Sequence, residues 1–176
     1  DHTEALSDEG FTGTIASGTV AIPQNNGTII GDFNIQPSFA FNGITNSIFT
    51  NGAFKASNTA GFIGKTLSQP FRIQRGVIHG SNNIGYIDNL NPNVTIKLFG
   101  KQGAAPTTGT DGDELATTTF VDTNNESVGR TLTSFDPDTF YDHVWMNVTH
   151  DGAANAMGVV EVVFHTIQIQ ETIFCT

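Results

Sequence analysis

The sequence predicts an all-β fold: a single antiparallel β-sandwich, jelly-roll-like or immunoglobulin-like, with a flexible N-terminal strand. Thr, Ile and Val are abundant whereas Leu is scarce, and β-branched side chains favour strands. No stretch of ten or more residues keeps an uninterrupted amphipathic helical period. A length of 176 residues fits one domain that can bury a core without disulfides or a metal.

The chain begins with a polar arm, residues 1–10, followed by a β-prone stretch punctuated by glycine, residues 11–22. We expect residues 23–176 to form the sandwich domain. An extended segment with apolar side chains can complete the open sheet edge of another subunit. Residues 11–22 are therefore a candidate donor strand, and the side chains that would be buried are Phe11, Ile15, Val20 and Ile22.

Three Asn-Gly pairs follow one another in the first third of the chain, at positions 26–27, 42–43 and 51–52. Each lies between β-prone residues, and the pair readily takes the positive φ angles of a two-residue hairpin turn. This pattern predicts a meander of short antiparallel strands.

Apolar and polar residues alternate most clearly in FRIQ (71–74), VTIKLF (94–99) and HVWMNVTH (143–150), which predicts half-buried strands. The apolar faces are formed by Phe71 and Ile73, by Val94, Ile96 and Leu98, and by Val144, Met146 and Val148. Polar, glycine-containing segments at 80–83 and 100–114 separate these strands at a spacing typical of a sandwich.

The C-terminal run GVVEVVFHTIQIQETIF is longer than most strands, and its apolar residues change face partway. Val160, Val162 and Phe164 share one face, whereas Ile167, Ile169 and Ile173 lie on the other. We expect either a β-bulge near His165 or a strand that passes from one sheet to the other.

The charge and the apolar content of the chain argue against nucleic acid as a partner and against a membrane span. Seven Lys and Arg stand against 17 Asp and Glu, a formal net charge of −10, which repels nucleic acid. No run of apolar residues is long enough to span a membrane. Residues 1–54 and 131–176 contain no Lys or Arg, an asymmetry that favours contact between the ends of one copy and the middle of another. Uneven solvation charge on a secreted surface is the alternative interpretation.

The start of the chain at Asp1, the scarcity of Lys and the single cysteine together predict an extracellular or cell-surface protein whose leader has been removed. We find no nucleophile elbow, and a thiol at Cys175, next to the end of the chain, is poorly placed for catalysis. The sequence therefore predicts a protein that is not an enzyme.

Two acidic segments are candidates for calcium binding, GTDGDE and SFDPDTFYD. Both place hard oxygen ligands on a turn-rich backbone, as calcium coordination requires. The carboxylates are those of Asp111, Asp113, Glu114, Asp136, Asp138 and Asp142. A solvated acidic loop is the alternative interpretation of each segment.

The segment IASGTVAIPQNNGTIIGDFNIQP, followed by FKASNTAGF, resembles the opening of the camelysin and TasA family of secreted β-sandwich proteins. Residues 17–22 correspond to the short Ser-Gly-Thr strand of that family and residues 58–61 to a later polar turn, so the resemblance covers roughly the first 60 residues. It implies a fibre subunit that inserts an N-terminal strand into its neighbour.

The sequence thus predicts a structural subunit of a secreted filament or surface assembly, a homopolymer built by strand complementation. One alternative is a calcium-dependent glycan-binding module, for which Trp145, Tyr86 and Tyr141 are the only Trp and Tyr residues that could stack on a sugar. Another alternative is a decoration protein of a phage or virion.

Overall fold

The computed structural model describes residues 14–81, 85–88, 91–123 and 129–172. It is an antiparallel β-fold, as the sequence predicts, with two short 3₁₀ helices. None of the helices within these ranges has the length and apolar character needed to cross a bilayer. The elements are β1 (Thr14–Ala21), β2 (Thr28–Gly31), η1 (Pro37–Phe41), η2 (Phe49–Asn51), β3 (Ala53–Asn58), β4 (Ala60–His79), β5 (Asn93–Lys101), β6 (Asp113–Val121), β7 (Gly129–Thr133), β8 (Phe140–His150), β9 (Asn155–Val159) and β10 (Glu161–Thr172).

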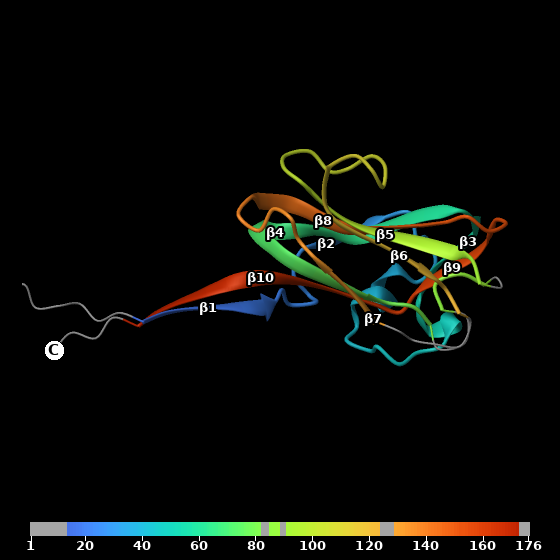
Figure 1. Ribbon diagram of the computed structural model, residues 1–176, viewed down its shortest axis with the longest axis horizontal. Helices are drawn as coiled ribbons and strands as arrows, with labels where there is room; N and C mark the ends of the chain where they lie inside the picture. The colour runs from blue at the N-terminus through green and yellow to red at the C-terminus, as the bar shows by residue number, and fades with distance from the viewer. Residues whose placement is uncertain (1–13, 82–84, 89–90, 124–128, 173–176) are drawn as a thin grey trace, which may run out of the picture.

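The long strand β4 joins two layers of sheet (Figure 1). Its first half pairs with β2 and β8, and β8 continues to β5 and β6. Its second half pairs with β10 and β7, and β10 continues to β1. A separate pair, β3 and β9, completes the described sheets. The layers therefore form a sandwich in which one strand belongs to both sheets.

The main core lies between these layers. Val94, Ile96 and Leu98 of β5 are fully buried, which confirms the predicted face of residues 94–99. The layers approach closely at Gly76 of β4, where an added Cβ would lie 2.2 Å from Cε of Met146. A glycine at this position therefore allows side chains of the opposite sheet to fill the space.

A second apolar cluster lies on the outer face of the β8 sheet, where Trp145 packs against Phe62 and Phe99. The segment that connects β5 to β6 covers this cluster, and the indole Nε1 of Trp145 donates a hydrogen bond to the carbonyl of Gly109 at 2.7 Å. Strand β8 is therefore buried on both faces, and the prediction of a half-buried strand at 143–150 was wrong. Alternation within a strand cannot reveal a distant segment that covers its polar side.

The predicted break in the C-terminal run is confirmed. The pairing of β10 with β4 shifts register between His165 and Thr166, and Gln74 is the additional residue on β4. The bulge lets Val162 and Phe164 face the core before the strand turns toward β1.

The predicted meander in the first third of the chain is wrong. Only the four residues of β2 form a strand between β1 and β3, and this strand pairs with β4 rather than with its neighbours in sequence. The Asn-Gly pair at 42–43 directly follows the 3₁₀ helix η1, and the Asn of the pair at 51–52 is the last residue of η2. The positive φ angle of Gly43, 79°, thus serves the end of a helical turn.

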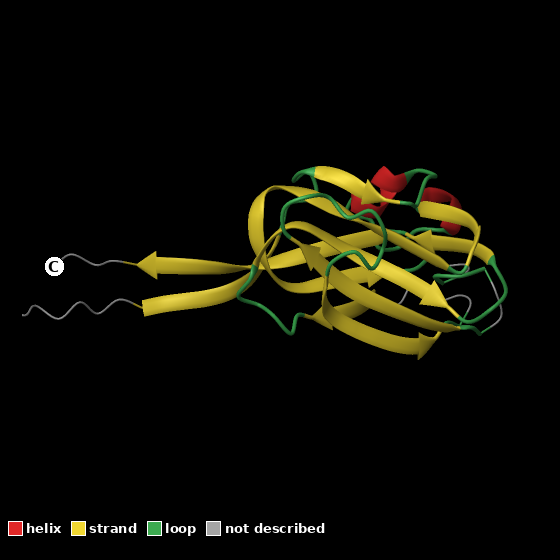
Figure 2. Ribbon diagram, turned by 90° about the horizontal axis from the view of Figure 1, so that it is seen from above, coloured by secondary structure: helices red, strands yellow, loops and turns green. Residues whose placement is uncertain are grey.

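Strand β1 pairs with β10 of its own chain along its whole length, from Thr14 opposite Thr172 to Ala21 opposite His165. The two strands form a ribbon that extends away from the body of the sandwich (Figure 2). The candidate donor strand is thus paired within its own chain as far as the structure describes it, and Phe11 lies outside the described residues. Ile15 belongs to β1, Val20 is 39% exposed and Ile22 is buried in the core.

Candidate functional site

An open groove of about 390 Å³ lies where the bend of β4 meets β8 and β10. Its lining residues come from three strands that are far apart in sequence: Gln69, Pro70, Phe71, Arg72, Phe140, Thr166 and Ile167. Apolar side chains form much of the groove, and Gln69, Arg72 and Thr166 supply polar atoms. Ligand sites commonly combine an apolar lining with a few polar groups in this way.

The groove exists because β4 bulges away from β8. Thr66 pairs with His143 and Phe71 pairs with Tyr141, so β4 carries three additional residues between these two positions. Pro70 suits this interruption since it has no N–H for a sheet hydrogen bond. The bulge thereby turns residues 69–72 toward the groove.

Asn26, in the turn before β2, holds the other side of this bulge. Its side-chain Nδ2 donates to Oγ of Ser68 at 2.8 Å, and the backbone N–H of Ser68 donates to Oδ1 of Asn26 at 3.0 Å. The first Asn-Gly pair therefore contributes to the position of Gln69 and Pro70 in the groove.

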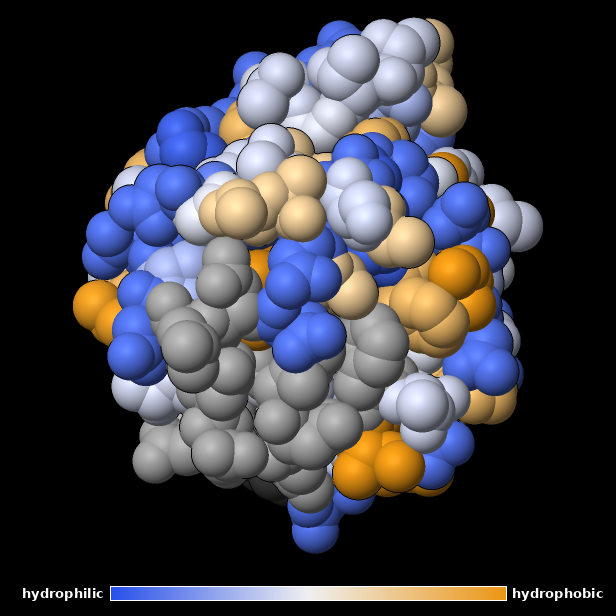
Figure 3. Space-filling view, turned by 90° about the vertical axis from the view of Figure 1, so that its right-hand side faces the viewer, coloured by the Kyte–Doolittle hydropathy of each residue, from blue (hydrophilic) through white to orange (hydrophobic). Residues whose placement is uncertain are grey.

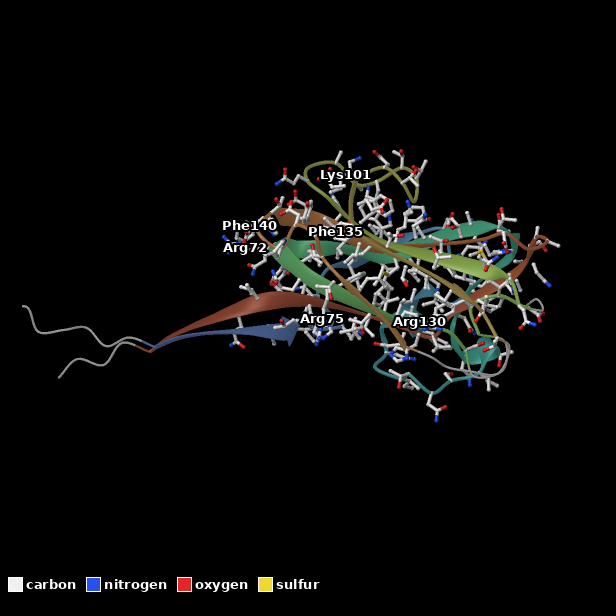
Figure 4. All side chains as sticks on the ribbon, in the orientation of Figure 1. Arg72, Arg75, Lys101, Arg130, Phe135 and Phe140 are labelled. Atoms are coloured by element: carbon white, nitrogen blue, oxygen red, sulfur yellow. The ribbon has the colours of Figure 1, made fainter. Side chains whose placement is uncertain are left out.

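Arg72 and Phe140 form the charged and aromatic part of the groove. They are cross-strand partners, and the guanidinium carbon of Arg72 lies 4.9 Å from the ring centroid of Phe140. Figure 4 shows them side by side at the end of the body from which the ribbon leaves. Phe140 is nevertheless 50% exposed, so its ring can contact a ligand as well as the arginine.

All four lysines have polar partners within the protein, whereas the arginines lack carboxylate partners among the described residues. Three lysines form ion pairs, at 2.6–2.8 Å, and Lys65 donates to the carbonyl of Gln24 at 2.9 Å. In the described part of the chain, no arginine forms an ion pair with a carboxylate. Arg72 and Arg130 instead lie over the rings of Phe140 and Phe120.

The three aromatic residues considered for sugar stacking are all buried. Trp145, Tyr86 and Tyr141 have 0–1% of their surface exposed, so they support the fold and cannot contact a ligand. Among the side chains that the structure describes, the exposed aromatic ones are phenylalanines, Phe135 at 70% and Phe140 at 50%. Sequence reasoning missed Phe140 because a lone phenylalanine at the start of a strand carries no signal of exposure.

The first acidic segment is engaged in ion pairs. Asp111 accepts hydrogen bonds from Lys101 at 2.8 Å and from the backbone and hydroxyl of Thr107. These contacts, led by that of Lys101, lower the pKa of Asp111 to about 2. Glu114 pairs with Lys97 at 2.7 Å, while Asp113 is exposed. The segment thus joins β5 to β6 through lysines rather than gathering carboxylates.

The second acidic segment organises its own turn. Asp136 accepts hydrogen bonds from the hydroxyls of Thr139 at 2.6 Å and Tyr141 at 3.2 Å. The hydrogen bond from Thr139 is the main cause of the lowered pKa of Asp136. Asp142 accepts from the backbone N–H of Gly103 at 2.7 Å, and Asp138 is exposed. Among the residues that the structure describes, no three acidic, histidine or cysteine side chains form a group that could hold a metal ion. The predicted calcium ligands therefore do not fit together as a calcium site.

The end of the molecule opposite the ribbon shows no continuous apolar face in its described part. There, hydrophobic residues form separate small patches among hydrophilic ones (Figure 3). That end therefore offers no broad apolar surface in its described part, in contrast to the largely apolar groove with Arg72 and Phe140.

The sequence matches no family model and no curated protein, but the fold is similar to solved carbohydrate-binding modules. One is a CBM32 module from Clostridium perfringens in complex with GalNAc-beta-1,3-galactose, with a TM-score of 0.55 and 14% identity over 82% of this chain and 99% of that chain. Another is the family 32 module of C. perfringens NanJ in complex with galactose, with a TM-score of 0.55 and 14% identity over 84% and 98%. A third is a fucose-binding module from Streptococcus pneumoniae, with a TM-score of 0.55 and 12% identity over 84% and 98%.

These similarities confirm the β-sandwich fold, and together with the pairing of β1 they overturn the predicted filament subunit. The similar structures are glycan-binding modules, and β1 fills the edge of β10 in its own chain. The prediction was wrong because a β-prone N-terminal segment has the same sequence pattern whether it pairs within its chain or in a neighbour. The resemblance of the first 60 residues to camelysin and TasA had suggested the second possibility.

Proposed function

We propose that this protein is an extracellular glycan-binding module that binds a sugar in the groove beside Arg72 and Phe140. The observation that carries the proposal is an exposed aromatic ring next to a guanidinium in an open, largely apolar groove. A sugar ring has apolar C–H faces and a rim of hydroxyls, so it suits a site with both kinds of surface.

The groove supplies complementary groups for such a ligand. Phe140 and Phe71 offer apolar surface, while Arg72 donates N–H groups to hydroxyl oxygens. Thr166 and Gln69 can each donate and accept hydrogen bonds. A fold shared with lectin-like modules adds support, although the argument for function rests on the site itself.

We propose binding without catalysis. Hydrolysis of a glycosidic bond usually requires two carboxyl groups that flank the bond, and the lining residues that the structure describes include neither Asp nor Glu. The proposal also gives calcium no role, because Asp111, Glu114, Asp136 and Asp142 already accept hydrogen bonds from protein groups. Binding should therefore be equal in EDTA and in added calcium.

The test is a glycan array probed with the tagged full-length chain, followed by calorimetric titration of the best ligand. Phe140→Ala should weaken binding at least about tenfold, since an apolar contact of this size is worth more than about 1.4 kcal/mol. Phe135→Ala is the matched control, because Phe135 is even more exposed but does not line the groove. Absence of binding to every glycan, or equal effects of the two variants, would refute the proposal.

A further inference from the structure

We infer that the groove selects a sugar that carries a carboxylate, such as a uronic or sialic acid residue; this inference rests on the proposed glycan-binding function. It concerns the charge of the ligand, which the proposed function leaves open. The chain has few cations among many anions, and it places them unequally.

Acidic residues outnumber basic ones by 17 to 7, so carboxylates are plentiful partners for any cation. Three lysines are indeed paired with carboxylates. Arg72 has no such partner among the described residues and instead lies over Phe140 at the groove. Its guanidinium is thus placed beside a binding surface with N–H groups that no carboxylate of the described residues neutralises.

Arginine is suited to bind a carboxylate because its planar guanidinium can donate two parallel hydrogen bonds to the two oxygens. Contact with the ring of Phe140 restrains the guanidinium, so less side-chain freedom is lost when a ligand binds. Of the described residues that line the groove, Arg72 alone is charged. A carboxylate in the groove would therefore meet a cation and no anion among these lining residues.

Three carboxylates lie within four residues of Phe140 in sequence. Asp138 is exposed and is not among the described residues that line the groove, and the other two are directed into their own loops. Asp136 accepts from Thr139 and Tyr141, and Asp142 accepts from the N–H of Gly103. The net charge of −10 repels an anionic ligand at long range. At physiological salt this repulsion is screened beyond about 8 Å, so the contact with Arg72 decides the preference.

The experiment compares ligands that differ only in charge, using the full-length protein in calorimetric titrations. Trigalacturonic acid and 3′-sialyllactose are each paired with their own methyl ester, in which a methyl group replaces the charge of each carboxylate. Wild type should bind the acidic member of at least one pair about tenfold or more tightly than the neutral member. The two pairs distinguish uronic acid from sialic acid as the source of the carboxylate.

Arg72→Gln should reduce the affinity for the acidic ligand to that for its neutral partner. Arg72→Lys should keep part of the preference for the acidic ligand. Arg130→Gln is the matched control, since Arg130 also lies over a phenylalanine ring but is well separated from Arg72 in Figure 4. It removes the same charge from the protein and should leave the preference unchanged. Thermal melts of each variant verify that the fold is intact.

The outcomes separate the two proposals. If neutral and acidic ligands bind wild type equally, or if Arg72→Gln weakens both equally, the groove binds glycans without selecting charge, and this inference fails alone. If Arg130→Gln removes the preference as fully as Arg72→Gln, overall charge is responsible and this inference also fails. If no glycan binds, the proposed function fails together with it.

Discussion

At the residue scale, the single tryptophan stabilises the fold and is not among the described residues that line the groove. Trp145 is fully buried, its ring stacks on Phe99 at 5.5 Å, and its Nε1 donates to Gly109. We expect Trp145→Phe to lower the free energy of unfolding by about 1–3 kcal/mol, through loss of packing and of this hydrogen bond. Chemical denaturation measures the change. Glycan affinity should stay as in wild type, and a loss of binding by a fully folded variant would place the tryptophan in the site.

Glu161 is a fully buried carboxylate that anchors the segment before η2. It accepts hydrogen bonds from the side-chain amide of Gln24 and from the N–H of Gly43 at 3.0 Å. Burial raises the pKa of Glu161 above its usual value of 4.5. The folded state therefore holds the proton more tightly, and ionisation of Glu161 costs stability as the pH rises through the folded-state pKa.

Glu161→Gln removes this ionisable group. The stability of the variant should therefore not fall as the pH rises through the folded-state pKa of Glu161. The melting temperature of the variant minus that of wild type should become more positive from about pH 4 to about pH 8. Differential scanning calorimetry across this range measures the difference. A difference that is constant with pH, or that falls, would contradict the assignment of Glu161 as a buried carboxylate that destabilises the fold when ionised.

The burial of a single residue could be predicted where it follows local alternation of apolar and polar residues. It could not be predicted where it depends on distant segments. The pattern at Val94, Ile96 and Leu98 identified a core face correctly. The exposure of Phe140 and the burial of Trp145 depend on which loops cover β8, and no local pattern carries that information. The groove was missed for the same reason, because its residues come from three separate strands.

At the scale of elements, the bulge in β4 determines the shape of the groove. The side chain of Asn26 makes two hydrogen bonds to Ser68, next to Gln69 and Pro70. We expect Asn26→Ala to reduce stability by about 1–2 kcal/mol and to weaken glycan binding severalfold, because the bulge loses its anchor. Asn58→Ala is the control: Nδ2 of Asn58 also donates a hydrogen bond, here to the backbone carbonyl of Ala56, and Asn58 does not line the groove. Equal loss of affinity in both variants would contradict this role.

Features within a single strand were predicted better than the strands with which it pairs. The bulge near His165 followed from a change of face along one strand, and the structure contains it. The meander failed because Asn-Gly pairs indicate positive φ without specifying whether a strand or a 3₁₀ helix precedes them. The passage of β4 between two sheets also depends on contacts between distant segments, and the sequence around Pro70 indicates only an interruption.

At the scale of the whole molecule, the ends of the described chain form one unit. β1 and β10 run antiparallel and leave the body together (Figure 1). Only the first part of β10, from Glu161 to Thr166, is also paired with β4. Beyond Thr166 the ribbon consists of two strands, so each strand depends mainly on the other for its backbone hydrogen bonds.

This arrangement predicts a protein that stays monomeric, because β1 already occupies the edge of β10 that a neighbour's strand would need. The full-length chain should sediment as a monomer at every concentration tested by analytical ultracentrifugation, and a peptide of residues 9–24 should not bind it. Deletion of residues 1–21 retains the buried Ile22 but frees the edge of β10. The truncated chain should keep its fold, melt several degrees lower, and bind the peptide. Ordered polymers of the full-length chain that disappear on truncation would instead mean that β1 is exchanged between subunits.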